Sequence, residues 1–539
     1  MLGLDVTHRL KEAPTAMTSD HRRFSLRARS QDGFTLIELL VVIVILGVLA
    51  AIVVFSVRGI GDKGHKSAVS AEATTLRTAE ESYCAKYGHY GTADDLKDDG
   101  LLSGVPGYNM VVVGEENKCG RGEKSSFALN DVSAPTEGGA DAIKAGTNPT
   151  DLTVDEKANR VYVVAQGSND VTVIDGKTDA AIGEPIDVSK AVSSPTRIAV
   201  DSGTGRVYVG GTGGVAIIDT KNANQVTHVN GYTTTVIGLA VSPENGDVYV
   251  GGGAASTSAV AYIASGSSSA TGIPLPAAGV VGANSSMDFS FDSERHAVYL
   301  AKAAVGSGTS LAGSIGLFAI SSQTHDARMA AQFETTTQFC GTNAGNVLVT
   351  NSVRGMTAVD PGRNRVYLLA RRCVPSPSGG LSIVATTIAI NPSDGSSTAI
   401  DDPVGTPYTP QSVVYNPAAG SAYVYLSGGT NCGGLGGRID RIVGTKVTGQ
   451  APVCGVSGAF GNQGHKLTVL RDFNRIFVAQ QNSTAPGGLG VADGGTLLGQ
   501  APLGKGRNFG ALATNNTTGK VYAVDPANGT VAVFRTGSA

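Results

Sequence analysis

The sequence lacks the short motifs that would indicate catalysis or metal binding. It contains no His-Glu-x-x-His, no Gly-x-Ser-x-Gly, no phosphate-binding loop and no Cys-x-x-Cys. The eight histidines are scattered, so they give no local support to a metal cluster. We therefore predict no catalytic residue, no metal site and no cofactor, and we expect that the protein is not an enzyme.

The sequence also lacks tryptophan and any large excess of charge. The net charge of −3 and pI of about 6.3 predict no bulk attraction to nucleic acid or acidic lipid. Glycine is abundant, with 73 of 539 residues, which favours turns and short strands, and the length predicts two or more domains. Six cysteines fit three disulfides in an oxidising compartment: Cys84, Cys119, Cys340, Cys373, Cys432 and Cys454.

Charge is nearly absent from residues 34–57, where Glu38 is the single charged residue among 24. As a helix this run extends about 36 Å, enough to cross a hydrocarbon core of about 30 Å. An acid in such a run is costly in lipid and should have a partner. Cleavage after Gly33 would supply one, because the new α-amine of Phe34 would lie four residues from Glu38.

The residues at this junction resemble the N-terminal motif of type IV pilins and pseudopilins. Gly33 precedes Phe34-Thr35-Leu36-Ile37-Glu38, and the preceding leader carries Arg22, Arg23, Arg27 and Arg29. The resemblance implies that a prepilin peptidase cleaves between Gly33 and Phe34 and methylates the amine of Phe34, and that Glu38 is the assembly glutamate. An ordinary signal anchor is the alternative, and a twin-arginine signal at Arg22-Arg23 fits less well because the apolar run is long and uninterrupted.

These features divide the first part of the chain into a leader at 1–33 and a pilin domain at 34–131. Within that domain, an apolar helix at 34–57 precedes a second part at 58–131 that contains a helix and a small head. The helical pattern continues to Tyr87, and its apolar stripe is expected to pack on a small sheet. A short helix is predicted after Thr92, and candidate strands lie at 111–113 and 127–129.

Four acids in the head raise the question of a calcium site, because some pseudopilins bind calcium there. The alternating Asp-x-Asp-x-Asp-Gly spacing is absent, so a solvated helix cap is the favoured interpretation. The four acids are Asp94, Asp95, Asp98 and Asp99. Cys84 and Cys119 are expected to form one disulfide within the head.

Repetition dominates residues 150–539. The stretch 149–155 returns as 195–201, and each copy is followed by a Val-Tyr strand and by a third strand that ends in Asp175 or Asp219. Short strands joined by Gly, Asn and Asp turns, with a unit of about 50 residues, indicate propeller blades. The Val-Tyr position recurs in eight units, at Tyr162, Tyr208, Tyr249, Tyr299, Tyr367, Tyr423, Phe477 and Tyr522.

The unit resembles the YVTN-type β-propeller repeat, although Ala, Gly or Leu replaces the usual Asn. We expect four-stranded blades, eight or alternatively seven, over 150–539. The last unit stops after its third strand, and residues 141–144 lie where a fourth strand would end, so 132–149 is interpreted as a linker and a ring-closing strand. The predicted fold class is multidomain, α+β plus all-β: a transmembrane pilin helix with a small head, then a β-propeller.

Inserts in the fifth, sixth and seventh units carry the other four cysteines. The preferred pairing is Cys340 with Cys373 and Cys432 with Cys454, because each pair stays within neighbouring strands and loops. Four arginines predict a small basic patch, either a solvated rim or a site for a polyanionic ligand: Arg363, Arg365, Arg371 and Arg372.

Together these features predict a structural subunit of an extracellular type IV pilus. The apolar helix would form the core of a helical homo-oligomer, and the propeller would be displayed outside for adhesion or surface interaction. The expected partners are a prepilin peptidase, the pilus assembly machinery, the cell membrane before assembly and an unknown surface ligand, but no nucleic acid. The alternatives are a minor or tip pilin or pseudopilin acting as an adhesin, and a filament-bound polysaccharide-active enzyme.

Overall fold

The structure is a computed structural model of the chain. It describes residues 74–91, 93–102, 109–113, 127–131, 136–137, 142–252, 260–276, 284–305, 313–335, 347–348, 355–403, 406, 408–429, 436–454, 467–480, 488–495, 499–503 and 507–535. The chain divides into two compact units, Met1–Ala68 and Val69–Ala539, and all described residues belong to the second. Within these ranges no helix is long and apolar enough to cross a membrane, and the apolar run at 34–57 lies outside them.

The described part of the head contains a helix over residues 74–87, the short helix α2 (Ala93–Asp98), and the strands β1 (Asn109–Val113) and β2 (Phe127–Asp131). The two strands pair antiparallel, which confirms both candidate strands. Leu76, Ala79 and Leu96 form the core of the head. Leu76 and Ala79 of the first helix therefore pack against α2. The predicted packing of this helix's apolar stripe on a small sheet stays a prediction.

Tyr87 is a correction, because it was assigned to this stripe but is 45% exposed. Its hydroxyl donates a hydrogen bond to Asp99 Oδ1 over 2.7 Å, and Lys86 Nζ lies 2.5 Å from the same oxygen. These two donors hold the pKa of Asp99 below its usual value, with the Lys86 contact the larger cause. A tyrosine with a polar partner at the surface does not need to enter the core.

The described strands beyond the head form eight antiparallel sheets, one for each predicted repeat unit. The first four blades are β5 (Pro149–Asp155), β6 (Arg160–Ala165), β7 (Asp170–Asp175) with β8 (Ala180–Ala181) and β9 (Ile186–Asp187); β10 (Ser193–Asp201), β11 (Arg206–Thr212), β12 (Gly214–Asp219), β13 (Gln225–His228); β14 (Val236–Val241), β15 (Val248–Gly252), β16 (Val260–Ile263), β17 (Ala270–Gly272); and β18 (Asn284–Asp292), β19 (Ala297–Val305), β20 (Gly313–Ser321), β21 (Ala327–Thr335).

The last four blades follow the same order. They are β22 (Val347–Leu348) and β23 (Thr357–Asp360) with β24 (Arg365–Pro375), β25 (Leu381–Ile390), β26 (Ser397–Asp401); β27 (Thr409–Asn416), β28 (Ser421–Gly429), β29 (Gly436–Val443), β30 (Lys446–Cys454); β31 (Leu467–Leu470), β32 (Arg475–Gln480), β33 (Gly488–Asp493), β34 (Gly499–Leu503); and β35 (Leu512–Asn515), β36 (Lys520–Asp525), β37 (Thr530–Arg535) with β3 (Thr136–Glu137) and β4 (Ile143–Lys144).

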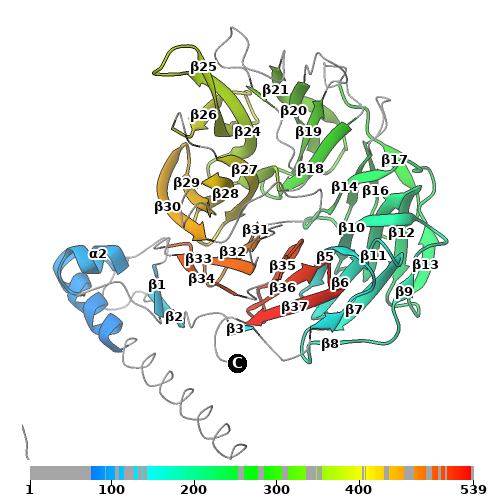
Figure 1. Ribbon diagram of the computed structural model, residues 1–539, viewed down its shortest axis with the longest axis horizontal. Coiled ribbons are helices and arrows are strands. Elements are labelled where there is room, and N and C mark those ends of the chain that lie inside the picture. The colour runs from blue at the N-terminus through cyan, green and yellow to red at the C-terminus, as the bar shows by residue number, and fades with distance from the viewer. Residues whose placement is uncertain are drawn as a thin grey trace, which may run out of the picture. The chain divides into compact units, whose positions relative to one another are not determined.

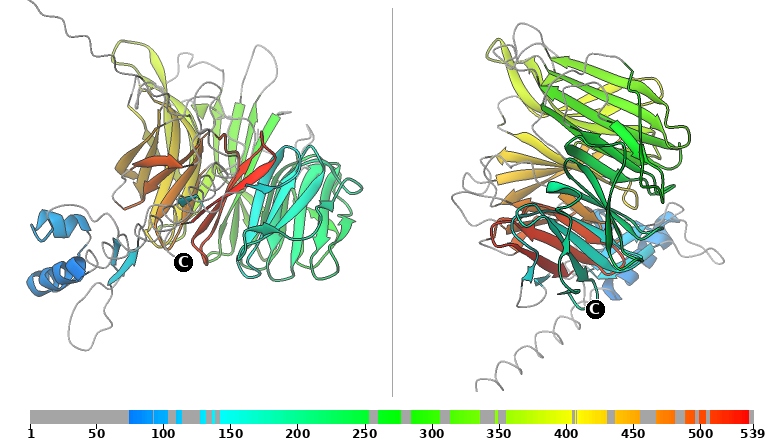
Figure 2. Two further views of the ribbon diagram at one scale, coloured as in Figure 1. Left: turned by 60° about the horizontal axis from the view of Figure 1, so that its bottom comes forward. Right: turned by 90° about the vertical axis from the view of Figure 1, so that its right-hand side faces the viewer.

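The blades follow one another around a ring, so that the red last blade lies beside the cyan first blade (Figures 1 and 2). The structure is thus an eight-bladed β-propeller. The recurring aromatic residue lies on the second strand of every blade and is at most 3% exposed. Because that strand is flanked on both sides within its sheet, a large side chain there is covered by the next blade, which explains why the position repeats.

The apolar core of the propeller lies between the blades. Eight clusters of buried side chains each combine residues of two adjacent blades, and one of them joins the eighth blade to the first. In that closing cluster, Val161 and Val163 of the first blade pack with Tyr522 and Val531 of the eighth. Each blade therefore depends on both neighbours, and the ring is stabilised as a whole.

The ring is closed by residues that precede the first blade. Ile143 and Lys144 of β4 pair with Val531 and Thr530 of β37, which confirms the predicted closing strand at these two residues. Ile143 is buried in the closing cluster. The structure adds β3, which pairs with Phe534 and Arg535 of the same strand and was not predicted.

Each blade turns from its first to its second strand on the same side of the ring, which we call the turn face. In six blades the first strand ends in a buried Asp or Asn whose side-chain oxygen accepts a backbone N–H from the turn, as Asp155 does from Ala158 over 3.0 Å. Asp175 and Asp219 accept backbone N–H groups after the third strand in the same way, so their prediction as turn residues is confirmed.

Candidate functional site

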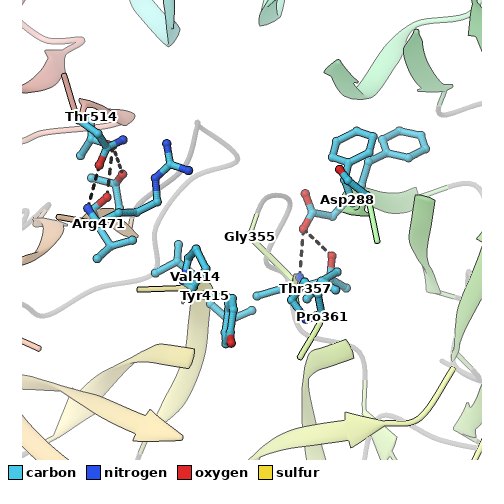
Figure 3. Close-up of a pocket in the computed structure, with 18 of the residues that line it drawn as sticks. Asp288, Gly355, Thr357, Pro361, Val414, Tyr415, Arg471 and Thr514 are labelled. Atoms are coloured by element: carbon cyan, nitrogen blue, oxygen red, sulfur yellow. Dashed lines mark hydrogen bonds between the residues drawn. The ribbon is translucent and has the colours of Figure 1, made fainter. Parts of the chain in front are cut away.

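A cavity of about 880 Å³ lies in the centre of the ring and opens at the turn face. It is lined mainly by the first strands of the blades and by the turns that follow them. Figure 3 shows Asp288, Thr357 and Pro361 on one side and Arg471 and Thr514 on the other, with Val414 and Tyr415 between them. A concave site of this size, lined by residues of several blades, is the candidate binding site.

In three blades, the side chain at one repeat position binds the inner strand to that of the next blade. This position lies 11 residues before the recurring aromatic residue and holds Asp151, Arg197 and Asp288 in three blades. Asp151 Oδ2 accepts the backbone N–H of Ile198 over 3.0 Å. A motif search misses this position, but alignment of the repeats on the aromatic residue finds it.

The other two side chains at this position also reach the following blade. Asp288 Oδ2 accepts two hydrogen bonds from Thr357, from its backbone N–H at 3.0 Å and from its hydroxyl at 3.2 Å. Arg197 Nε donates to the backbone oxygen of Ile237 over 2.9 Å. All three side chains are almost fully buried, so these charged contacts position the wall of the cavity.

A chain of hydrogen bonds around the turn face links the fourth blade to the first. Arginine and asparagine side chains supply most of the donors, and backbone, side-chain amide or carboxylate oxygens accept. The links are Arg295 Nη1 to Pro361 O (2.7 Å), Arg363 Nη1 to Gly420 O (3.1 Å), Asn416 Nδ2 to Arg471 O (3.2 Å), Arg471 N to Asn516 Oδ1 (2.8 Å) and Asn516 Nδ2 to Glu156 Oε1 (2.8 Å).

The rim of the cavity carries charges that are largely matched by protein partners. Glu156 Oε1 accepts hydrogen bonds from the backbone N–H and from the side-chain amide of Asn516, and Glu156 Oε2 lies 3.9 Å from Arg471 Nη2. The Tyr415 hydroxyl donates to Asp360 Oδ1 over 2.9 Å, and burial raises the pKa of Tyr415 above its usual value. The rim can therefore orient a polar ligand without presenting a strong field of either sign.

The predicted basic patch is not formed. Arg363 lies in the turn before β24 and binds Asp360 Oδ2 over 2.9 Å, whereas Arg371 and Arg372 lie near the far end of that strand. Arg372 pairs with Asp401, and burial lowers the pKa of Arg371. Residues eight apart on a strand are separated by about 26 Å, so the four arginines cannot act on one ligand.

Two histidines contribute to a clasp between the third and fourth blades. His325 Nε2 lies 3.0 Å from Asp247 Oδ2, and its ring stacks on Tyr262 with centroids 3.5 Å apart. His296 contacts Glu244, whose pKa is lowered, first by the hydroxyl of Ser322 and then by His296. Among the described residues, no group of three or more His, Cys, Asp or Glu side chains is arranged to hold a metal ion.

The residues predicted for processing and assembly, Gly33, Phe34 and Glu38, lie outside the described residues. Cys84 and Cys373 are each disulfide-bonded. Their predicted partners, Cys119 and Cys340, lie outside the described residues, as does Cys432. Cys454 ends β30, and the pairings remain predictions.

Comparison with known proteins identifies the N-terminal motif. Residues 28–54 match the family described as the prokaryotic N-terminal methylation motif. The type II secretion system core protein G of Klebsiella michiganensis is 39% identical over 69 residues, which is 13% of this chain and 49% of that protein. Its counterpart in Aeromonas hydrophila is 36% identical over 73 residues, 14% of this chain and 51% of that protein. The chain spans about half the length of these curated relatives.

Among solved structures, a chain of Kuenenia stuttgartiensis hydrazine synthase matches with a TM-score of 0.43 and 12% identity. The match covers 74% of this chain and 98% of the hydrazine synthase chain. A similarity at this level supports no inference about function. The sequence match and the observed fold together define the organisation of the protein. The chain joins an N-terminal segment of the type IV pilin and pseudopilin kind to an eight-bladed β-propeller.

Proposed function

We propose that the protein is a subunit of an extracellular type IV pilus that carries its propeller on the filament surface as a binding module. The observation that carries the proposal is the N-terminal methylation motif at 28–54, which spans the Gly33–Phe34 junction and Glu38. The relatives named above are components of type II secretion, so a pseudopilus is the second filament class in which this segment could assemble.

The assembly chemistry follows from the position of one charge. Cleavage before Phe34 leaves a positive amine at the start of an apolar helix, and Glu38 lies one helical turn away. In an apolar environment the two charges are more stable as a pair than separately, because either charge alone is strongly destabilised. The pair can form between neighbouring subunits, which fixes their axial stagger in the filament.

The first test compares Glu38→Ala with the unmodified protein in membrane and sheared-filament fractions. We expect normal membrane insertion, because removal of a charge favours transfer into lipid, and loss of the protein from filaments. Glu81→Ala, at an exposed position of the head, is the matched control and should assemble normally. Filaments of the Glu38→Ala protein in normal amount would contradict the proposed role.

Copy number separates a main filament subunit from a minor or tip subunit. A propeller of this length has a radius of gyration of about 21 Å, so a copy on every subunit needs a wide stagger or a long connection. Mass spectrometry of purified filaments should show this chain as the bulk component if it forms the filament. A trace amount would instead favour a tip adhesin.

The proposal assigns binding, not catalysis, to the propeller. Support comes from the matched charges at the cavity rim, which leave little for acid–base chemistry to use. Hydrolysis or elimination of polysaccharide by the purified protein, at a rate removed by substitutions in the cavity, would contradict this assignment.

A further inference from the structure

The wall of the central cavity offers backbone hydrogen-bonding groups from many directions. The first strand of each blade pairs only with strands on its outer side, so its inner edge faces the centre of the ring. Such an edge presents unpaired N–H and C=O groups in alternation. Several of these groups bind the neighbouring blade, as Val413 N–H binds Gly355 O over 2.7 Å and Ile198 N–H binds Asp151 over 3.0 Å. A ligand that combines donors and acceptors around its perimeter can bind the groups that remain.

The charges that line the cavity disfavour a strongly charged ligand. They are three acids and one arginine, which opposes a polyanion. Two of the acids, Asp288 and Glu156, already accept two hydrogen bonds each from protein donors, which leaves few carboxylate lone pairs to bind a cation. Arg471 and Glu294 remain at the rim as exposed polar groups.

The remaining lining residues are apolar faces and hydroxyls. Phe291 and Tyr415, which are partly buried, supply aromatic surface, while Thr468 and Thr514 place their hydroxyl oxygens 3.3 Å apart across two blades. Aromatic rings accept the apolar face of a ligand, and hydroxyls can donate or accept according to need. The volume of 880 Å³ lies in the range of about 300–1,000 Å³ that holds a small organic ligand.

We propose that this cavity binds a short neutral glycan, such as the end of an uncharged polysaccharide chain. A sugar ring carries hydroxyls around its perimeter and C–H groups on its faces, which matches a ring of strand edges with aromatic patches. An extended peptide matches less well, because its backbone groups lie in one plane and can pair with only one or two of the converging edges.

The inference deepens the binding role proposed above, on which its biological use rests, but sugar binding itself does not need filament assembly. The Glu38→Ala protein should therefore bind sugar as the unmodified protein does. Sugar binding with failed assembly would separate the two proposals, and normal assembly without sugar binding would overturn only this one.

The test uses the full-length protein in a detergent without a sugar head group, such as an alkylphosphocholine. Saturation-transfer NMR and calorimetry would be carried out with maltotriose, cellotriose and triacetylchitotriose. Trigalacturonic acid and a capped tetra-alanine peptide serve as the anionic and peptide comparators. We expect at least one neutral trisaccharide to bind more tightly than both comparators.

Thr514→Trp should abolish this binding by filling the cavity, since Thr514 lies on its wall. Thr227→Trp is the matched control, because Thr227 is exposed on the outer strand β13 and its replacement should leave binding unchanged. If thermal melting shows that Thr514→Trp is unfolded, Arg471→Ala replaces it as the cavity variant. Its expected loss of affinity for the sugar is about tenfold.

No binding by any of the three neutral sugars, or unchanged binding by the cavity variant that folds, would overturn the proposal. Tighter binding of the anionic sugar or of the peptide would overturn the ligand class.

Discussion

Among the described residues, the core of the head contains three buried apolar side chains, Leu76, Ala79 and Leu96, whereas each interface between propeller blades contains between nine and thirteen. The head also encloses an acid, because Glu80 is fully buried beside this core. Burial of apolar area is the main stabilising contribution in both regions.

The two regions also differ in how their parts are connected in sequence. The described head core is formed within about 25 residues, from the helix at 74–87 and from α2. The propeller joins β37 near the C-terminus to β3 and β4, which precede the first blade. Closure of the ring therefore depends on contacts between residues far apart in sequence, which are these two pairings and the closing cluster, and these contacts form only when the eighth blade meets the first.

The largest expected effect follows from removal of the closing strands. Residues 132–539 expressed alone should fold, whereas residues 150–539 should have a much lower melting temperature or aggregate. The shorter fragment lacks β3 and β4, exposes the edge of β37 and loses the burial of Ile143, which alone is worth about 1.5–3 kcal/mol. Thermal melting and light scattering measure the difference.

The control is a fragment that starts at residue 139, which keeps β4 but lacks β3. Its melting temperature should lie between those of the other two fragments. Equal melting temperatures for the fragments that start at 132 and at 150 would show that these strands do not close the ring.

The second prediction compares one leucine in each region. Leu76→Ala in the head and Leu300→Ala between the third and fourth blades both remove a fully buried side chain. Each should cost about 2–5 kcal/mol. We expect Leu76→Ala to lower only the melting transition of the head and Leu300→Ala only that of the propeller.

Calorimetry of the full-length protein resolves the two transitions. If each variant shifted both transitions together, the head and the propeller would unfold as one cooperative unit and the comparison between them would fail.

The sequence predicted the propeller well because its signal is repeated. The buried aromatic residue of the second strand gives the number of blades, and the missing fourth strand of the last unit gives the closing segment. The strand β3 was missed because two residues, Thr136 and Glu137, carry no period that a pattern can detect. Its pairing depends on the position of β37, which the local sequence does not encode.

The features of the cavity were harder to predict for a different reason. Asp151, Arg197 and Asp288 occupy one repeat position but differ in type, so no motif unites them. The predicted arginine patch was wrong because proximity in sequence was taken as proximity in space. The extended strand β24 separates Arg363, in the turn before it, from Arg371. The distance between two such residues depends on where the strand begins and ends, and the sequence pattern does not predict these bounds to the exact residue.

The third prediction concerns the cysteines, which are expected to stabilise each region separately. Replacing Cys84 and Cys119 together by serine should lower the stability of the head by about 2–4 kcal/mol and leave the propeller transition unchanged. Replacing Cys340 and Cys373 together should instead lower the stability of the propeller and leave the transition of the head unchanged. Peptide mapping of the unreduced protein provides the check, since a peptide linking Cys84 to a propeller cysteine would contradict the predicted pairing.

The smallest expected effect is a pH dependence confined to the head. Burial raises the pKa of Glu80 from about 4.5 to about 7, although the N–H of Gly91 donates to its Oε2 over 3.1 Å and opposes the shift. Asp95 and Glu81 add smaller raising contributions. At neutral pH, the folded head therefore holds a proton on this carboxyl more strongly than the unfolded chain does.

The sign of the effect follows from linkage, because stability rises wherever the folded state takes up the proton first. The contribution is fully present below pH of about 4.5 and is lost as the pH rises through about 7. The head should thus melt at a higher temperature at pH 5 than at pH 8, apart from changes that other groups cause. Glu80→Gln should remove this difference, since the amide stays neutral. The matched Glu81→Gln at an exposed neighbouring position should retain most of it, because Glu81 adds only a smaller raising contribution to the pKa of Glu80. Melting curves of the three proteins between pH 4 and 9 measure the effect, and an unchanged pH dependence in Glu80→Gln would show that another group is responsible.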